Sequence, residues 1–185
     1  MIHFKQKQFN TTVWTGGKTT ELYIFPEDSS YEARDFQFRL STATVESENS
    51  EFTSLPGVRR TLMVLRGQME LIHENQYSKL LGPFDTDHFE GGWKTRSKGK
   101  CTDVNLMCRE LWSGGIRRIK LVAGQRMEVP LKGSVNFLYV FKGTIHSDGL
   151  IINEGDLLKV EPHMPEAILA HSECDLIAIE LQQGN

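Results

Sequence analysis

The stretch Leu62-Met63-Val64-Leu65-Arg66-Gly67 returns later in the chain as Leu138-Tyr139-Val140-Phe141-Lys142-Gly143. Both copies read apolar, any residue, apolar, apolar, cation, glycine, and each is followed by a short polar–apolar strand and an acidic turn. The glycine is expected to end a strand at a tight turn, so that the next strand pairs back against it. A hairpin used twice predicts two similar β-barrels from a duplicated unit. The competing interpretation is that any two β-hairpins share such a pattern.

The rest of the chain has the same period-two patterning and no helical stripe longer than about ten residues. Short strands punctuated by turn residues predict a sandwich or barrel. The expected strands are Thr20–Phe25, Gln37–Val45, Thr61–Leu65, Gln68–His73, Asp103–Leu111, Arg117–Val122, Val135–Phe141, Asp156–Val160 and Leu176–Leu181. The turn-rich stretch Trp112–Gly115 predicts a boundary between an N-terminal barrel at 1–112, carrying the pocket, and a structural C-terminal barrel at 113–185.

The second half is similar to a cupin. Gly155-Asp156, an apolar strand, Pro162 and then His171 resemble the second cupin motif. The first cupin motif needs a close histidine pair and a glutamate, yet 124–143 contains no histidine. His163 and His171 are left without partners at ligand spacing, so we expect no metal and no cofactor. The fold class expected is all-β, with two tandem cupin-like jelly-roll barrels, a bicupin.

Composition narrows the class of partner. The 185 residues carry a net charge of −3, which argues against a general electrostatic grip on nucleic acid. Three cysteines without a CxxC pair suit reduced thiols. The amino terminus lacks a signal-peptide core and no stretch is long enough to span a bilayer, so we expect a cytoplasmic protein that does not bind membranes.

Polar residues gather on strands of the N-terminal half. Alternation along Phe38–Val45 places Arg39, Ser41, Ala43 and Val45 on one face, which could look into a barrel cavity. There Arg39 could hold a carboxylate in a bidentate pair while Ser41 donates a further hydrogen bond. An outward-facing arginine on an ordinary strand is the alternative.

Two further segments point to the same face. Arg59 and Arg60 precede the repeated strand, and because neighbours on a strand face opposite ways, we favour Arg60 as the one inside. Asp103, Asn105 and Met107 share one side of a later strand, a mixture that a dry core would not select. A buried Asp103 needs a partner, and one of these arginines is the obvious choice, although such a pair could be purely structural.

The segment around Trp14 is a weaker candidate. Gly16-Gly17 follows the tryptophan, and Thr19 enters the next strand. Consecutive glycines, here ending at Gly17, let backbone amides approach an anion closely. A simple turn with Trp14 as core filler explains the same residues.

Taken in series, these segments resemble the HutD/Ves family of small bacterial bicupin proteins. The matching residues are Trp14, Gly16-Gly17, Thr19-Thr20-Glu21, Phe38-Arg39-Leu40-Ser41, Ala43-Thr44-Val45, Phe52-Thr53, Leu55-Pro56-Gly57, Arg60-Thr61-Leu62, Gly67, Phe89-Glu90-Gly91 and Asp103-Val104-Asn105-Leu106-Met107. The likeness covers roughly residues 10 to 110, and the rest agrees mainly in length and β-pattern. Departures are the shorter glycine turn, Arg59 where an acidic residue is common, and Cys108-Arg109 where an arginine pair is common.

The resemblance implies a tandem cupin-like barrel, no established catalytic activity and, in some members, a link to the regulation of histidine utilisation. It also implies a small acidic ligand such as formylglutamate or urocanate. The residues themselves agree on one point, that arginine, hydroxyl and amide groups favour a small carboxylate. We therefore expect a binding protein with a small acidic ligand.

Two alternatives remain. One is an enzyme of isomerase or hydrolase type with Asp103 in acid–base chemistry, assisted by His73 or His88. Neither histidine lies in a recognisable catalytic motif, and a lone histidine at a strand end is more often simply exposed. The other, a metal-dependent dioxygenase, is disfavoured by the missing histidine pair. The sequence also allows a homodimer formed through barrel edges, because proteins usually cover the unpaired backbone groups of edge strands.

Overall fold

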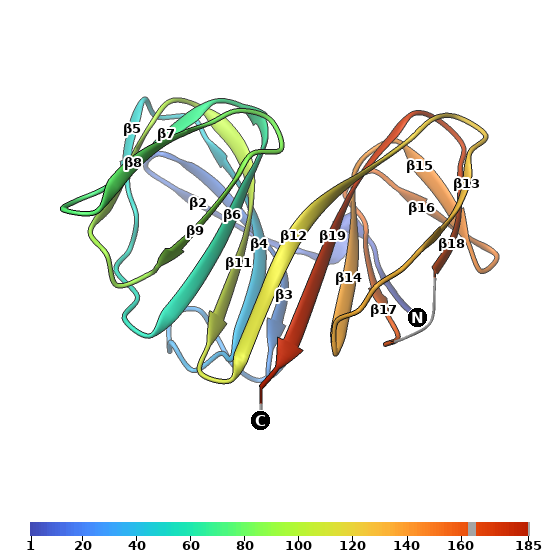
Figure 1. Cartoon of the computed structure of the whole chain (residues 1–185), viewed down its shortest axis with the longest axis horizontal. Coiled ribbons are helices and arrows are strands. Elements are labelled where there is room, and N and C mark those ends of the chain that lie inside the picture. Colours follow the sequence, from blue (N-terminus) through green and yellow to red (C-terminus); the bar gives the residue numbers. More distant parts are fainter. Residues whose placement is uncertain (163–165, 185) are drawn as a thin grey trace. The chain divides into compact units, whose positions relative to one another are not determined.

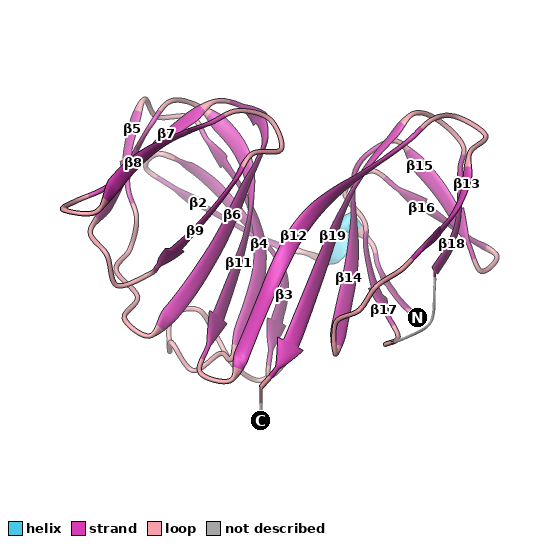
Figure 2. Cartoon of the chain, viewed as in Figure 1, coloured by secondary structure: helices cyan, strands magenta, loops and turns pink. Residues whose placement is uncertain are grey.

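The computed structural model describes residues 1–162 and 166–184, and it is built almost wholly of β-strands (Figures 1 and 2). One 3-10 turn, η1 (Gln6–Gln8), interrupts them. The strands are β1 (Ile2–Phe4), β2 (Asn10–Trp14), β3 (Gly17–Phe25), β4 (Phe38–Val45), β5 (Asn49–Glu51), β6 (Val58–Gly67), β7 (Met69–His73), β8 (Tyr77–Leu81), β9 (Thr86–Glu90), β10 (Thr95–Lys98), β11 (Cys101–Arg109), β12 (Trp112–Leu121), β13 (Arg126–Val129), β14 (Val135–Lys142), β15 (Thr144–Ser147), β16 (Leu150–Asn153), β17 (Leu157–Val160), β18 (Glu166–Ala170) and β19 (Cys174–Gln183). The predicted all-β class is confirmed.

The chain divides into two compact units, each with two β-sheets. The first barrel comprises Asn10–Ser113 with Gly184, and the second barrel comprises Met1–Phe9 with Gly114–Gln183. The first nine residues therefore differ from the expected 1–112 range. They belong to the second barrel because β1 pairs with β17, with Ile2 opposite Lys159.

Asp156 fixes this amino-terminal segment within the second barrel. Its carboxylate accepts hydrogen bonds from the Gln6 backbone N–H at 2.8 Å and lies 2.9 Å from His3 Nε2. It also accepts the Asn153 backbone N–H at 3.1 Å. One buried carboxylate thus closes a turn of its own barrel and holds the start of the chain.

The two barrels repeat one strand order. In the first, the sheets run β2-β3-β4-β11-β6-β9 and β5-β10-β7-β8. In the second, they run β12-β19-β14-β17-β1 and β13-β18-β15-β16. Matching β4–β11 of the first barrel with β12–β19 of the second reproduces both sheets, with β2 and β3 added to one barrel and β1 to the other. This common topology is what a duplicated unit predicts.

The repeated motif lies at equivalent places in both barrels, but the expected hairpin is wrong. β6 pairs with β11 and β9, and β7 pairs with β8 and β10, so the chain changes sheets at Gly67. Gly67 has φ +80° and Gly143 has φ +89°. A Cβ at Gly67 would collide with Lys100 O, and one at Gly143 with Glu173 O, so each glycine admits the neighbouring strand's backbone where the sheets meet.

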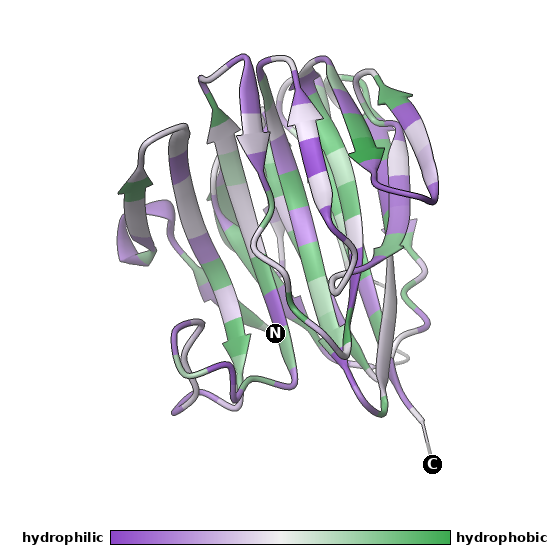
Figure 3. Ribbon diagram, turned by 90° about the vertical axis from the view of Figure 1, so that its left-hand side faces the viewer, coloured by the Kyte–Doolittle hydropathy of each residue, from purple (hydrophilic) through white to green (hydrophobic). Residues whose placement is uncertain are grey.

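The interiors of the barrels differ in composition. A continuous apolar cluster that includes Leu138, Val140, Leu176 and Ala178 fills the second barrel. The first barrel has two smaller clusters, one around Leu62 and Val64 and one around Val58 and Met107. Figure 3 shows polar and apolar residues alternating along the strands. Inside the first barrel the polar residues Arg60, Asp103 and Asn105 are all buried.

Candidate functional site

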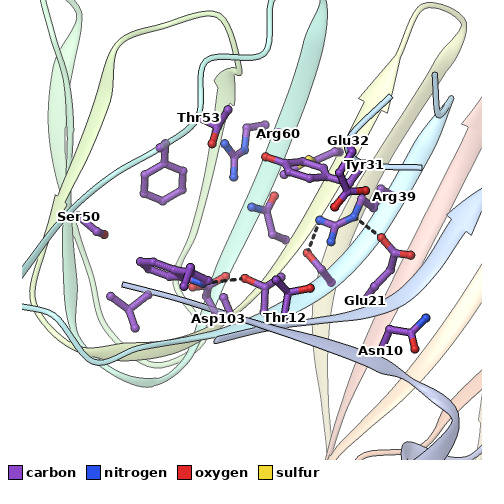
Figure 4. Close-up of a pocket in the computed structure, with 18 of the residues that line it drawn as sticks. Asn10, Thr12, Glu21, Tyr31, Glu32, Arg39, Ser50, Thr53, Arg60 and Asp103 are labelled. Carbon is purple, nitrogen blue, oxygen red and sulfur yellow. Dashed lines mark hydrogen bonds and ion pairs between the residues drawn. The ribbon is translucent and has the colours of Figure 1, made fainter. Parts of the chain in front are cut away.

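A cavity of about 570 Å³ opens in the first barrel (Figure 4). Strands β2, β3, β4, β6 and β11 contribute to its wall, together with the loops around Tyr31 and Phe52. Eight of the nine residues singled out from the sequence line it: Trp14, Thr19, Arg39, Ser41, Arg60, Asp103, Asn105 and Met107. The ninth, Gly17, is not among the lining residues. Whether these side chains contact a ligand stays a prediction.

Strand register explains why these residues meet. On β11, Met107 lies opposite Arg39 of β4 on one side and opposite Arg60 of β6 on the other. Asn105 lies opposite Ser41, and Asp103 lies opposite Ala43. Residues directly opposite in antiparallel strands point to the same face, so the alternating polar positions of three strands form one wall.

Arg60 is the least satisfied group in this wall. Its side chain is buried, and its Nε lacks a hydrogen-bond acceptor among the described residues. The guanidinium lies over two aromatic rings, 4.7 Å from the centroid of Phe52 and 5.3 Å from that of Phe89. Burial lowers its pKa to about 10, which leaves it charged at neutral pH. A buried cation with an open donor favours an anionic ligand.

Asp103 and Asn105 add acceptors to the same wall, four and two positions along β11 from Met107, which lies opposite Arg60. Burial raises the pKa of the Asp103 carboxyl to about 7, against the opposing effect of Arg60 and of the Cys101 thiol, whose Sγ lies 3.9 Å from Oδ2. The Cys101 thiol stays protonated because burial raises its pKa to about 12. Asn105 Oδ1 is buried without a partner in the described structure. An unpaired buried acceptor costs about 1–3 kcal/mol, which a ligand donor would recover.

Arg39, by contrast, is already neutralised. Its Nε donates to Glu21 Oε2 at 2.6 Å and its Nη1 donates to Ser41 Oγ at 3.2 Å. Its guanidinium also lies 4.6 Å from the centroid of the Tyr31 ring. Figure 4 shows Glu21 against this arginine and the Tyr31 ring extending from Arg39 toward Arg60. The hydroxyl of Ser41 is therefore used within the wall.

Arg59 points away from the cavity. Its Nη2 donates to the carbonyls of Glu110 at 2.8 Å and Trp112 at 2.6 Å, and it is not among the lining residues. The expectation that only one of the adjacent arginines on β6 reaches the interior is met by Arg60. Arg59 instead holds the turn between β11 and β12.

The glycines near Trp14 serve packing and differ from the expected anion nest. A Cβ at Gly16 would collide with the Trp14 ring, and one at Gly17 would collide with Thr44 O. The Gly16 carbonyl accepts the N–H groups of Glu46 and Ser47. Both glycines are required because the ring and the backbone of β4 approach closely, and Trp14 Nε1 donates to Thr19 Oγ1 at 3.2 Å on the cavity rim.

The two histidines considered for catalysis lie elsewhere. His73, expected to be exposed, is buried, with Nε2 3.0 Å from Asp87 Oδ2 and Nδ1 2.8 Å from Thr95 Oγ1. His88 Nδ1 lies 2.9 Å from Thr61 Oγ1. Neither is among the residues that line the cavity. The buried His73–Asp87 pair links β7 to β9.

Within the part of the chain that the structure describes, no group of three His, Cys, Asp or Glu residues is arranged to hold a metal ion. His171 packs against His146 with their ring centroids 5.9 Å apart, but two imidazoles do not make up a group of three metal ligands. His163 lies outside the described residues. The metal-free expectation stays a prediction.

Sequence reasoning missed three residues that shape the cavity. Glu21 shares the alternation of Thr19 along β3, so strand periodicity could have indicated it. Tyr31 and Phe52 come from irregular segments and reach the arginines only through the folded loops. No local sequence pattern indicates such contacts.

The second barrel shows what the same positions contain without a cavity. Val64 lies opposite Asp103 and Leu62 opposite Asn105, whereas the equivalent Val140 and Leu138 lie opposite Leu176 and Ala178. Both of the latter are fully buried in the apolar cluster. Arg60 corresponds to Asn136, whose amide bonds to both Gly133 backbone groups. The polar wall is therefore not a requirement of the barrel itself.

Two jelly-roll barrels with one repeated topology define a bicupin, and solved structures share this fold. A conserved protein of unknown function from Pseudomonas aeruginosa is 21% identical, with a TM-score of 0.79 over 98% of both chains. The bacterial pirin YhhW from Escherichia coli in complex with nickel(II) is 10% identical, with a TM-score of 0.76 over 100% of this chain and 99% of that one. HutD from Pseudomonas fluorescens, in a formate condition, is 22% identical, with a TM-score of 0.72 over 100% of this chain and 99% of that one.

The family model described as HutD matches residues 6–177, so the chain belongs to the HutD family. The cupin-like fold and the predicted family are thereby confirmed. No curated protein matches the chain significantly. Among the described residues, no helix has the length and apolar character needed to cross a membrane.

Proposed function

We propose that this HutD-type cupin protein is a receptor for a small carboxylate, held by Arg60 in the cavity of the first barrel. The single observation that carries the proposal is the buried guanidinium whose Nε has no acceptor among the described residues. A carboxylate in the cavity would pair with the guanidinium that lines it, and a ligand donor would bind at Asn105, which lines it too. Binding of this kind needs no metal or cofactor, and neither nucleic acid nor a membrane is the expected partner.

The barrel comparison supports this proposal. Asp103 and Asn105 of the first barrel occupy the positions equivalent to Leu176 and Ala178, which are apolar and fully buried in the second barrel. Buried polar groups without partners lower stability, so their presence in only one of two barrels favours a role in binding. The family membership supports histidine-degradation intermediates, such as urocanate or formylglutamate, as ligands and a regulatory role in histidine utilisation.

Isothermal titration tests the proposal directly. Formate, urocanate and formylglutamate would be titrated into the wild-type chain, into Arg60→Gln and into the control Arg96→Gln, which removes an exposed arginine of β10 that does not line the cavity. Loss of a charged hydrogen-bond pair predicts an affinity about ten- to hundredfold lower for Arg60→Gln. Wild-type affinity in Arg60→Gln, or no binding of any carboxylate, would contradict the proposal.

The regulatory part has its own test. Cells that produce the Arg60→Gln chain at the wild-type level should show an altered expression of histidine-degradation genes when histidine is supplied. An unchanged response would remove the regulatory role and leave the binding site intact.

A second candidate is an enzyme that acts on a small acid, with Asp103 moving a proton. The observation favouring it is a carboxyl whose pKa, about 7, suits acid–base chemistry at neutral pH. Turnover of a candidate acid, abolished in Asp103→Asn while binding persists, would favour the enzyme over the receptor. Neither His73 nor His88 is available as its partner, because neither lines the cavity.

A further inference from the structure

The cavity wall contains two arginines, and among the described residues only Arg39 has a carboxylate bonded to it. Arg39 is bound by Glu21 at 2.6 Å, by Ser41 at 3.2 Å and by the face of the Tyr31 ring. Arg60 has no such acceptor for its Nε among the described residues. The two lie on the same face with one strand between them, so their backbone positions are roughly 10 Å apart. A ligand in this cavity can therefore lie near both.

The remaining charges of the wall are mostly negative. Glu21, Glu32 and Glu51 line the cavity along with Asp103. Glu32 and Glu51 are exposed at its rim, and neither has an ion pair in the described structure. A second anionic group on the ligand would face these carboxylates, and at Arg39 it would meet a guanidinium whose charge Glu21 already balances.

We infer that Glu21 makes the cavity selective for ligands with one carboxylate over dicarboxylates of the same length, because it neutralises Arg39 and leaves Arg60 as the arginine of the wall without a bonded carboxylate among the described residues. This inference rests on the proposed carboxylate site and specifies the charge class of its ligand. Among the acids named above, it places monoanionic urocanate before dianionic formylglutamate. Glu21 is a specificity residue that acts through Arg39.

Three ligands of matched length test this selectivity on the wild-type chain. Valerate has one carboxylate, glutarate has two, and monomethyl glutarate keeps the length and polarity of glutarate with a single charge. Titration calorimetry should give valerate and monomethyl glutarate affinities about tenfold higher than that of glutarate, the size expected for one charge acting over roughly 10 Å. If glutarate binds as tightly as its monomethyl ester, the inference is wrong while the carboxylate site stands.

Substitution then identifies the residue responsible. Glu21→Gln should release Arg39 and raise glutarate affinity about tenfold relative to monomethyl glutarate. The matched control, Glu27→Gln, removes the same charge from an exposed residue that does not line the cavity, and it should keep the wild-type order of affinities. An equal gain in both variants would assign the preference to total charge and overturn the role of Glu21. If none of the three acids binds the wild-type chain while formate does, the cavity is too small for the inferred class and the inference falls alone. Failure of formate as well would overturn the proposed site with it.

Discussion

Arg60 and Asp103 lie on the neighbouring strands β6 and β11, and each partly offsets the pKa shift that burial causes in the other. Desolvation lowers the pKa of Arg60 and raises that of Asp103, while the attraction between the two groups moves both values back. At neutral pH the cavity wall therefore contains a charged guanidinium and a carboxyl whose pKa of about 7 lies close to the ambient pH. The charge of the cavity therefore changes most steeply near physiological pH.

Stability should depend on this carboxyl. The pKa of Asp103 rises from 3.8 to about 7 on folding, so between these values the folded chain holds a proton that the unfolded chain has lost. The free energy of unfolding should therefore fall as pH rises through this window, by up to about 4 kcal/mol from this group alone. Asp103→Asn lacks the effect. Urea unfolding at pH 5 and pH 8 should show the variant gaining stability over the wild type at the higher pH, and parallel pH profiles would contradict the shift.

Anion affinity should follow the same titration. Protonation of Asp103 removes a negative charge beside Arg60, which itself stays charged because its pKa is about 10. Formate should bind about tenfold more tightly at pH 6 than at pH 8. Calorimetry on Asp103→Asn provides the control, since its affinity should be almost independent of pH over that range. A wild-type affinity that does not change with pH would separate Asp103 from the anion site.

Two buried asparagines should respond differently to truncation. Asn136→Ala removes both hydrogen bonds to Gly133 and should cost about 2–4 kcal/mol of unfolding free energy. Asn105→Ala removes an unpaired buried oxygen and places there the residue type of Ala178, so it should cost less than about 1 kcal/mol. Chemical denaturation of both variants measures the contrast. A large loss in Asn105→Ala would show that this amide is structural.

The paired glycines allow a similar test. Gly67→Ala should destabilise the chain by about 2–4 kcal/mol, because it combines a positive φ with a collision against Lys100 O. Gly57→Ala is the control, since Gly57 also has a positive φ, +76°, but its Cβ would meet nothing within 4 Å. Its cost should be about 1 kcal/mol. If urea unfolding shows equal losses of stability in the two variants, the positive φ alone, and not the collision, determines the loss.

Strand alternation carried most of the sequence-based prediction. Period two along Phe38–Val45 and Asp103–Met107 placed the polar residues on one face, because side-chain direction in a strand follows directly from position. Strands β1, β2, β5, β8, β10 and β13 were among those missed, since they are short and most of their residues are polar or exposed. The hairpin at Gly67 was wrong because a glycine turn indicates a change of direction without identifying the strand that follows as a partner.

Strand alternation could not predict the contacts that loop residues make. Phe52 covers Arg60 and Tyr31 covers Arg39 only after segments distant in sequence fold together. Gly16 and Gly17 looked like an anion nest, and the structure uses them for close packing against Trp14 and Thr44. In both cases tertiary proximity decides the role, and no residue type or spacing encodes it.

The pairing of β1 with β17 has a consequence for synthesis of the chain. Ile2 leaves the ribosome about 157 residues before its partner Lys159 is made. At about 5–20 residues per second, the amino-terminal strand waits roughly 10–30 s for its place in the sheet. Asn10–Ser113 can meanwhile complete its own barrel, because all of its sheet partners up to β11 have been made. The residues that line the cavity are thus all made before β1 can pair with β17.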